Sequence, residues 1–391
     1  MKKVLYGSTA LVAAGALASP AAAEEGVKLG LGGYYNSYFW VGDYDEDAGD
    51  PRDLGPTGIY ADGEVHFKGS TTLDNGITFG VQIELEAFQS GDQIDENYAF
   101  IEGSFGRFVI GGENTAAYMM QYGAPFVGAP INSGWVTSFV PPPVGVTTGS
   151  AVVPGAAASP TSASPATTAT TSTAIAVTTG FRTPALSTYG DLTNDDHTID
   201  YFSPRFSGFQ LGVSYTPANT INGEGKNFPV QADQDSELNN GFSVGVNFVD
   251  SFGDVDVAVA GGYRRAESPD GSGLEDPEMY SAGLNLGYAG FTIGGSFLLE
   301  DSDRATDGWG ADAGISYSTG PWGASVTGFH SEVEGTAASG EDDMNAIVGA
   351  VSYAVGPGIK ASLSVLWAEW DGEGSVDSDG IGGIVGMRMG F

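Results

Sequence analysis

The chain has 391 residues, and its 49 acidic residues against 14 lysines and arginines give a formal net charge of −35. This acidic excess excludes nucleic-acid binding, which needs a basic surface, and the lack of cysteine excludes disulfides, thiolate metal sites and cysteine nucleophiles. The 61 glycines, with 11% aromatic and only 16% charged residues, favour tightly turning strands over a water-soluble enzyme.

Residues 1–23 are predicted to be a cleaved secretory signal. Lys2 and Lys3 precede an apolar run over 4–18, and three alanines at 21–23 form a small-residue cleavage site. The alternative is a membrane anchor, but the run is shorter than the roughly 20 residues that a spanning helix needs. Cleavage would remove two lysines and no acid, which takes the net charge from −35 to −37. We therefore expect an exported protein.

Alternating apolar and polar segments recur through the rest of the chain, and short connections take turns with long ones. The short connections lie at 73–76, 104–107, 205–208, 251–254, 288–290, 319–322 and 355–358. The long ones, rich in Asp, Glu, Gly and Pro, lie roughly at 41–57, 89–94, 114–197, 217–238, 265–277, 300–308, 331–343 and 371–380. Short turns on one rim and long loops on the other are typical of an outer-membrane barrel.

Each segment has two faces of different polarity. In 242–248, FSVGVNF, phenylalanines and valines share one face and polar or small residues the other. In 77–88, ITFGVQIELEAF, the apolar face opposes one that carries Gln82, Glu84 and Glu86. The outward face carries no charge in these strands, and a charge at the bilayer midplane would cost about 2–4 kcal/mol there. A soluble β-sandwich also alternates, but its connections need not alternate in length.

These patterns predict an all-β fold: a transmembrane antiparallel β-barrel of about 16 strands over residues 24–391. Every backbone polar group in the membrane has to be paired, so the sheet must close and the last strand must pair with the first. In the final segment Ile381, Val385, Met387 and Phe391 share one parity. We expect that parity to face lipid and the segment to be the closing strand.

Two blocks carry a more specific resemblance. Residues 73–120, LDNGITFGVQIELEAFQSGDQIDENYAFIEGSFGRFVIGGENTAAYMM, closely resemble the general diffusion porins of Gram-negative bacteria, particularly the alphaproteobacterial type. The terminal GMRMGF, 386–391, resembles the aromatic signal by which the barrel-assembly machinery recognises such proteins. The resemblance implies a water-filled homotrimeric barrel in the outer membrane, beside lipid and lipopolysaccharide. It also implies a third long loop, 114–197, that folds inward and forms a constriction, with loop acids facing basic wall residues.

The resemblance assigns the pore residues one by one. Glu113 becomes the first acid of the third loop, and 114–126 would pack against the inner wall. Inward-facing bases are Lys28, His66, Lys68, Arg107 and Arg388. Because the last strand neighbours the first two, Lys28, His66, Lys68 and Arg388 would form one basic patch, opposed by Glu113, Glu84 and Glu86. Further acids of lumen parity are Asp62, Glu64, Asp254, Asp256 and Asp312. Each residue has the alternative of being an ordinary solvated lumen side chain.

The third loop departs from the family pattern because a Pro/Ala/Ser/Thr-rich tract occupies 139–180. No charged residue occurs between Glu113 and Arg182. The tract lacks the large apolar side chains that would offset its ordering entropy. It is read as a floppy excursion from the loop tip, with a neutral plug or an external projection as the alternative.

Other chemistry is weakly supported. The acids in 43–50, DYDEDAGD, lack the Gly and the terminal Glu of a calcium loop, so they are expected to be solvated loop residues, with loose binding of a divalent cation as the alternative. Acids at 301 and 303 are read in the same way, as solvated loop residues. The three histidines, His66, His197 and His330, have no motif around them that would support acid–base catalysis. We therefore expect neither an enzyme nor a cofactor.

The leading functional hypothesis is passive diffusion of small hydrophilic solutes and ions through a weakly cation-selective channel in the cell outer membrane. A solute-specific channel is the first alternative, although the sequence shows no clear ladder of aromatics or arginines along the lumen. A structural or adhesive surface barrel that uses the Thr/Ala/Pro-rich loop is the second, and an outer-membrane enzyme the third.

Overall fold

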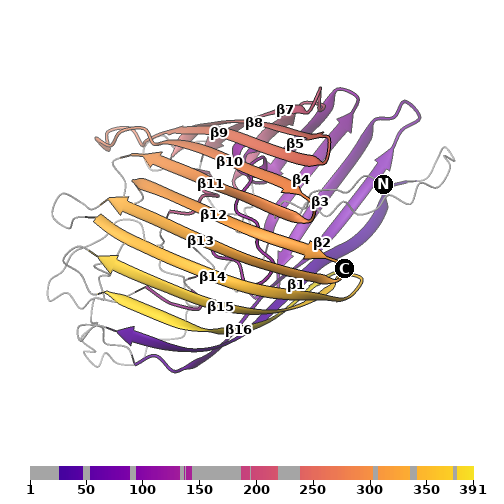
Figure 1. Cartoon of the computed structure of the whole chain (residues 1–391). Helices are drawn as coiled ribbons and strands as arrows, with labels where there is room; N and C mark the ends of the chain where they lie inside the picture. Colours follow the sequence, from indigo (N-terminus) through magenta and orange to yellow (C-terminus); the bar gives the residue numbers. More distant parts are fainter. Residues whose placement is uncertain are drawn as a thin grey trace, which may run out of the picture.

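The computed structural model describes residues 26–46, 53–88, 94–132, 136, 138–142, 186–193, 195–218, 238–302, 307–334, 341–372 and 377–391. Within these ranges, antiparallel strands in sequential order form one closed barrel of sixteen strands (Figure 1). This confirms the predicted fold class and the alternation of short turns with long loops. The predicted signal, 1–23, lies outside the described residues.

The strands have the following bounds: β1 Lys28–Glu46, β2 Thr57–Thr72, β3 Thr78–Glu86, β4 Ile94–Gly103, β5 Gly106–Gly112, β6 His197–Phe202, β7 Phe209–Ala218, β8 Asn239–Phe252, β9 Val255–Glu267, β10 Glu278–Tyr288, β11 Phe291–Asp301, β12 Gly308–Thr319, β13 Trp322–Glu334, β14 Glu341–Gly356, β15 Ile359–Gly372 and β16 Ser378–Gly390. A short helix, α1 (Ala116–Met119), lies in the third long loop. No helix in the described ranges combines the length and the apolar composition needed to cross a membrane.

The seam between β1 and β16 closes the barrel, as the C-terminal pattern predicts. Tyr34 lies opposite Gly390 at the short-turn end of the seam, and the ladder continues to the pair of Glu46 and Ser378 at the long-loop end. Beyond Gly390, the Gly33 amide donates to the Phe391 carbonyl at 3.0 Å and the Phe391 amide donates back at 3.1 Å. The backbone of the last residue is therefore part of the closed sheet, and the start of β1 and the C-terminus lie at the short-turn rim (Figure 1).

The outer face is apolar where the alternation predicted it. Phe209, Phe242, Ile293 and Val365 are 46–57% exposed on this face although they are large apolar side chains. Such a surface is unfavourable in water and suits a lipid environment. Along the same strands the alternate residues point inward and are mostly buried or half-buried.

Part of the barrel interior is a packed apolar core. Inward-facing side chains of β13 to β16 and β1 are buried against the third loop, and they include Phe329, Met344, Leu366, Trp370 and Ile384. The loop contributes apolar residues between Val127 and Val140 to the same cluster. Because the interior of this sector is filled, the inner wall there differs from a simple water-lined surface.

Candidate functional site in the barrel lumen

The third loop, which joins β5 to β6, lies inside the barrel and follows its inner wall. Successive loop amides donate to inward-facing wall side chains: Ala116 to Ser214 Oγ (2.7 Å), Ala117 to Ser243 Oγ (3.0 Å), Ala124 to Asp312 Oδ1 (3.1 Å), Val127 to Ser325 Oγ (3.1 Å) and Ala129 to Ser364 Oγ (3.0 Å). These partners belong to β7, β8, β12, β13 and β15 in turn. The predicted packing of 114–126 against the wall is thus confirmed.

The outgoing part of the loop continues to the wall of β15, β16 and β1. The Phe139 carbonyl accepts from the Tyr44 hydroxyl at 2.8 Å, and the Val140 carbonyl accepts from Trp370 Nε1 at 3.0 Å. The Phe139 ring also lies about 6 Å, centroid to centroid, from those of Tyr38 and Tyr60. The prediction of a floppy excursion is wrong for these first residues, because large side chains anchor them. The rest of the tract, from 143 onward, lies outside the described residues.

The returning part of the loop, from Leu186, packs beside the outgoing part. Asp312 of β12 joins the two: it accepts from the Ala124 amide, from Asn132 Nδ2 at 3.2 Å and from the Thr188 hydroxyl at 3.4 Å. The Ser296 amide and hydroxyl donate to it as well. Asp312 was predicted to be an acid of lumen parity, and it does lie on the inner wall, but its oxygens hold the loop to that wall.

Glycines on the inner wall let the loop backbone approach closely. A Cβ at Gly283 of β10 would overlap the carbonyl oxygen of Tyr122, and one at Gly245 of β8 would lie 2.8 Å from the carbonyl oxygen of Ala116. The atoms that would be met are backbone, so a rotamer change cannot relieve the overlap. The glycine and serine pattern of the wall therefore sets the path of the loop.

The loop begins at Glu113, beyond β5, and its outgoing part ends near Tyr60 of β2. Between these ends lies the inner face of β2, β3 and β4, which we call the charged wall. Its titratable side chains are Asp62, Glu64, His66, Lys68, Glu84, Glu86, Asp95, Glu96 and Glu102. Seven of these nine side chains are carboxylic acids, so this wall gives the lumen its local charge.

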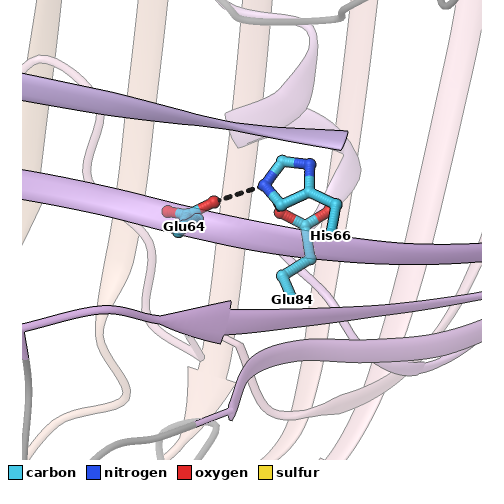
Figure 2. Close-up of side chains that lie close together, drawn as sticks. All are labelled: Glu64, His66 and Glu84. Atoms are coloured by element: carbon cyan, nitrogen blue, oxygen red, sulfur yellow. Dashed lines mark hydrogen bonds and ion pairs between the residues drawn. The ribbon is translucent and has the colours of Figure 1, made fainter. Parts of the chain in front are cut away.

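Three of these side chains meet at one point (Figure 2). His66 Nε2 lies 2.7 Å from Glu64 Oε2 and 2.8 Å from Glu84 Oε2. His66 and Glu84 are directly opposite each other in the β2–β3 ladder. The Tyr34 hydroxyl donates to Glu64 Oε1 at 2.6 Å, and the Gln82 amide donates to Glu84. Carboxylate oxygens of Glu86 and Asp95 also lie within 4.8 Å of Glu64, so these two acids border the same point.

The predicted basic patch is not formed. Arg388 lies opposite Asn36 of β1, whereas Lys68 lies opposite Gly30, six residues farther along the strand. At about 3.4 Å per residue these positions are about 20 Å apart. His66 contacts Glu64 and Glu84. Lys28 is exposed opposite Ser70, beyond the last β16 residue that pairs with β1 at the short-turn end. The bases are therefore spread along the wall.

The other predicted residues have separate surroundings. Glu113 is buried, and its Oε1 accepts from the Asn114 amide at 3.0 Å. The Arg107 guanidinium lies 4.6 Å from the centre of the Phe100 ring and also faces Tyr98. Arg388 lies over Phe126 of the third loop, at 5.7 Å from the ring centre. Arg388 is thus the predicted base that contacts the inward-folded loop.

Sequence reasoning missed two basic residues of the lumen. Lys360 of β15 lies directly opposite Arg388 of β16, so the two cations are neighbours on the inner wall. Arg264 of β9 is buried beneath the loop, where its Nε is 3.8 Å from Asp191 and its Nη1 donates to Ser281. The inward parity of both residues could have been read from the sequence. The contact between Arg264 and Asp191 could not, because only the folded structure brings the loop to β9.

Solved structures share the architecture of this barrel. A form of OmpT, an outer membrane protein of Vibrio cholerae, that lacks loop L8 is 13% identical, with a TM-score of 0.57 over 94% of this chain and 100% of that one. The anion-selective porin from Comamonas acidovorans is 13% identical, with a TM-score of 0.53 over 93% of this chain and 100% of that one. A mutant of the Rh. blastica porin is 14% identical, with a TM-score of 0.51 and the same coverage. At these identities the likeness concerns the fold.

A search of curated proteins found no match. The family model described as Gram-negative porin matches residues 7–371, which is nearly the whole chain. The match agrees with the closed barrel, the apolar outer face and the third loop that follows the inner wall. The chain therefore belongs to the Gram-negative porin family.

Proposed function

We propose that this porin is a water-filled channel of the outer membrane through which small hydrophilic solutes and ions diffuse passively, with a weak preference for cations. The observation that carries the preference is the charged wall of β2, β3 and β4, where carboxylates outnumber bases. The wall lies between the two ends of the inward-folded loop, so ions that pass beside the loop pass these acids.

Charge at the lumen wall outweighs the larger charge on the loops. Screening at physiological salt limits the reach of each exposed charge to about 8 Å. Acids at the outer rim therefore act little on an ion that is already inside, whereas acids at a narrow, partly dehydrated site are screened less and focus the field. The charged wall consequently decides selectivity, although most of the net charge of the chain lies elsewhere.

Selectivity is tested by the reversal potential of purified protein in a planar bilayer under a potassium chloride gradient. We expect potassium to be preferred over chloride by a modest factor, more strongly at low salt. Glu86→Gln should reduce the preference, and Glu113→Gln should reduce it if the start of the loop lies at the constriction. Glu369→Gln removes the same charge from an exposed position on the outer parity of β15 and should leave it unchanged. Anion preference of the unmodified protein would overturn the proposal.

Export through a cleaved signal is the second part of the proposal. The three-part pattern of residues 1–23 places cleavage after Ala23, with Glu24 as the first residue of the mature chain and a barrel domain over 24–391. The intact mass of protein extracted from outer membranes should lack the first 23 residues. A mass that still includes them would contradict this part.

A homotrimer is the proposed assembly, and the sector of the barrel with the shortest described strands, β5 and β6, supports it. β5 and β6 have only 7 and 6 residues. Six residues at about 3.3 Å each, tilted by about 40°, rise only about 15 Å, less than the apolar band of about 25 Å in barrels of this type. The outer face there has an apolar hollow lined by Val81, Ile101 and Ile110. A neighbouring barrel would cover this sector, and native mass spectrometry would report three chains.

The proposed partners follow from the location: outer-membrane lipid and lipopolysaccharide around the barrel, and the barrel-assembly machinery during insertion. Conductance also separates the competing functions. Block by one class of solute would favour a specific channel, and a folded but silent barrel would favour a structural or adhesive role. We expect no enzymatic activity.

A further inference from the structure

The point where Glu64, His66 and Glu84 meet has an unusual set of hydrogen-bond contacts (Figure 2). Two carboxylate oxygens, from neighbouring strands, lie within 2.8 Å of the same nitrogen, Nε2 of His66. One N–H can point directly at only one of these oxygens, so at most one of the two contacts is a well-aligned hydrogen bond. The carboxylates also bring two negative charges to one imidazole. A cation placed between the three atoms would bind all of them and offset the repulsion.

We propose that Glu64, His66 and Glu84 form a binding site for a divalent transition-metal ion in the wall of the lumen, with Zn²⁺ as the probe that matches its donors. One imidazole nitrogen and two carboxylate oxygens are ligands that zinc uses in proteins, and a fourth position would be left for water. Mg²⁺ and Ca²⁺ take oxygen ligands, so an imidazole in the set selects against them.

The dimensions of the site fit such an ion. Zinc binds nitrogen and carboxylate oxygen at about 2.0–2.2 Å, which puts tetrahedral ligands about 3.4 Å from one another. The two carboxylate oxygens lie 2.7 and 2.8 Å from Nε2, so each needs to move away from it by only about 0.6–0.7 Å to admit the ion. Their backbone positions are fixed, because Glu64 and His66 share one face of β2 and Glu84 faces His66 in the ladder.

Groups around the site orient its donors. The second oxygen of Glu64 is held by the Tyr34 hydroxyl, and that of Glu84 by the Gln82 amide, so both Oε2 atoms are directed to His66. Both of these holding groups are neutral. The Tyr34 ring meets the imidazole edge-on, with centroids 6.3 Å apart. Outer hydrogen bonds of this kind fix ligand orientation in metal sites.

The site is accessible and lies in a negative field. The side chains of His66, Glu64 and Glu84 are 11–12% exposed on the lumen side of β2 and β3. Glu86 and Asp95 lie within 4.8 Å of Glu64 and add to the negative potential. A bound ion would cancel part of the charge of the wall. This consequence rests on the proposed cation preference, whereas the binding itself does not.

Binding is tested by isothermal titration of purified full-length protein in detergent with zinc chloride, and separately with magnesium chloride. All proteins carry His330→Gln, which removes the donor from another group of this kind, His330, Glu332 and Asp343. His66→Gln and Glu84→Gln should each weaken zinc binding by more than about tenfold, because even the outer partners of metal ligands are worth 10–100-fold. Glu102→Gln, which removes a carboxylate elsewhere on the same wall, should bind zinc as the parent does.

Equal zinc affinity in all variants, or no zinc binding by the parent, would overturn the site. Heat-modifiable mobility in gels confirms that each variant is folded, and Glu84→Gln keeps the test open if His66→Gln fails to fold. The reversal potential with and without zinc then separates the two proposals. Zinc binding by a protein without cation preference supports the site and contradicts the proposed selectivity, and a cation-preferring channel that binds no zinc does the reverse.

Discussion

Gly283→Val should lower the single-channel conductance and broaden its distribution, while the barrel still forms. The new Cβ would overlap the backbone of Tyr122, which has no rotamer by which to move away. The loop is held on either side by Gln121 Nε2, which donates to the Ala282 carbonyl at 3.1 Å, and by the Ala124 amide, which donates to Asp312. Because the obstacle lies between wall and loop, the loop must shift towards the lumen axis. Overpacking of this kind costs about 1–3 kcal/mol of stability.

Gly349→Val is the matched control. This glycine is also in a strand, β14, but a Cβ there would meet no heavy atom within 4 Å. Valine suits a strand with an apolar outer face, so the control should conduct as the unmodified protein does. Conductance recorded in a planar bilayer decides the matter. If Gly283→Val and Gly349→Val conduct alike, the path of the loop does not depend on close approach at this glycine.

The strands and their closure could be predicted because two solvents act on the two faces of each strand. Period-two alternation over 242–248 and 77–88 reflects lipid on one side and the lumen on the other. The register comes from the structure, because the predicted connection at 73–76 does not by itself specify which residues pair. The turn after Thr72 pairs that residue with Thr78, and counting outward from it pairs His66 with Glu84. This contact, on which the metal proposal depends, was not predicted, because inward parity and residue type assigned His66 to a basic patch.

The filled sector of the lumen was missed although the sequence carries a signal for it. In β14 and β15 the inward residues Met344, Val348, Leu366 and Trp370 are as apolar as the outward ones. A strand that faces lipid and water should be apolar on one side only. Apolar residues on both parities therefore indicate that something covers the inner face. Here the cover is the third loop.

The anchors of the loop could not be identified from sequence. Ser214, Ser243, Ser325 and Ser364 look like ordinary lumen-lining residues, since each is a small polar side chain of inward parity. Their partners are backbone amides about 98 to 235 residues away in the chain. An amide carries no side-chain signature, so no pattern links the two. The role of Asp312 was hidden for the same reason.

Phe391→Ala should reduce the yield of folded barrel far more than the loss of one exposed side chain explains. Phe391 is 63% exposed on the lipid-facing parity, so its ring packs little within the chain. Its backbone pairs with Gly33 at the β1–β16 seam, and alanine keeps both of those hydrogen bonds. Any large loss of assembly therefore has to come from recognition of the terminal aromatic side chain, as the resemblance of the last six residues to the assembly signal implies.

Phe252→Ala supplies the comparison. Phe252 is 60% exposed and lies at the short-turn end of β8. Its replacement by alanine therefore removes the same ring from a similar place on the outer face. The yield of heat-modifiable oligomer in outer membranes should be the same for Phe252→Ala as for the unmodified protein, whereas the yield for Phe391→Ala should fall. Deletion of Phe391 should be worse again, because it also removes the two hydrogen bonds at Gly33 from a seam where backbone groups have to be paired. Equal yields for Phe391→Ala and Phe252→Ala would show that the terminal ring is not read during assembly, and a defect confined to the deletion would assign the role of this residue to the backbone seam.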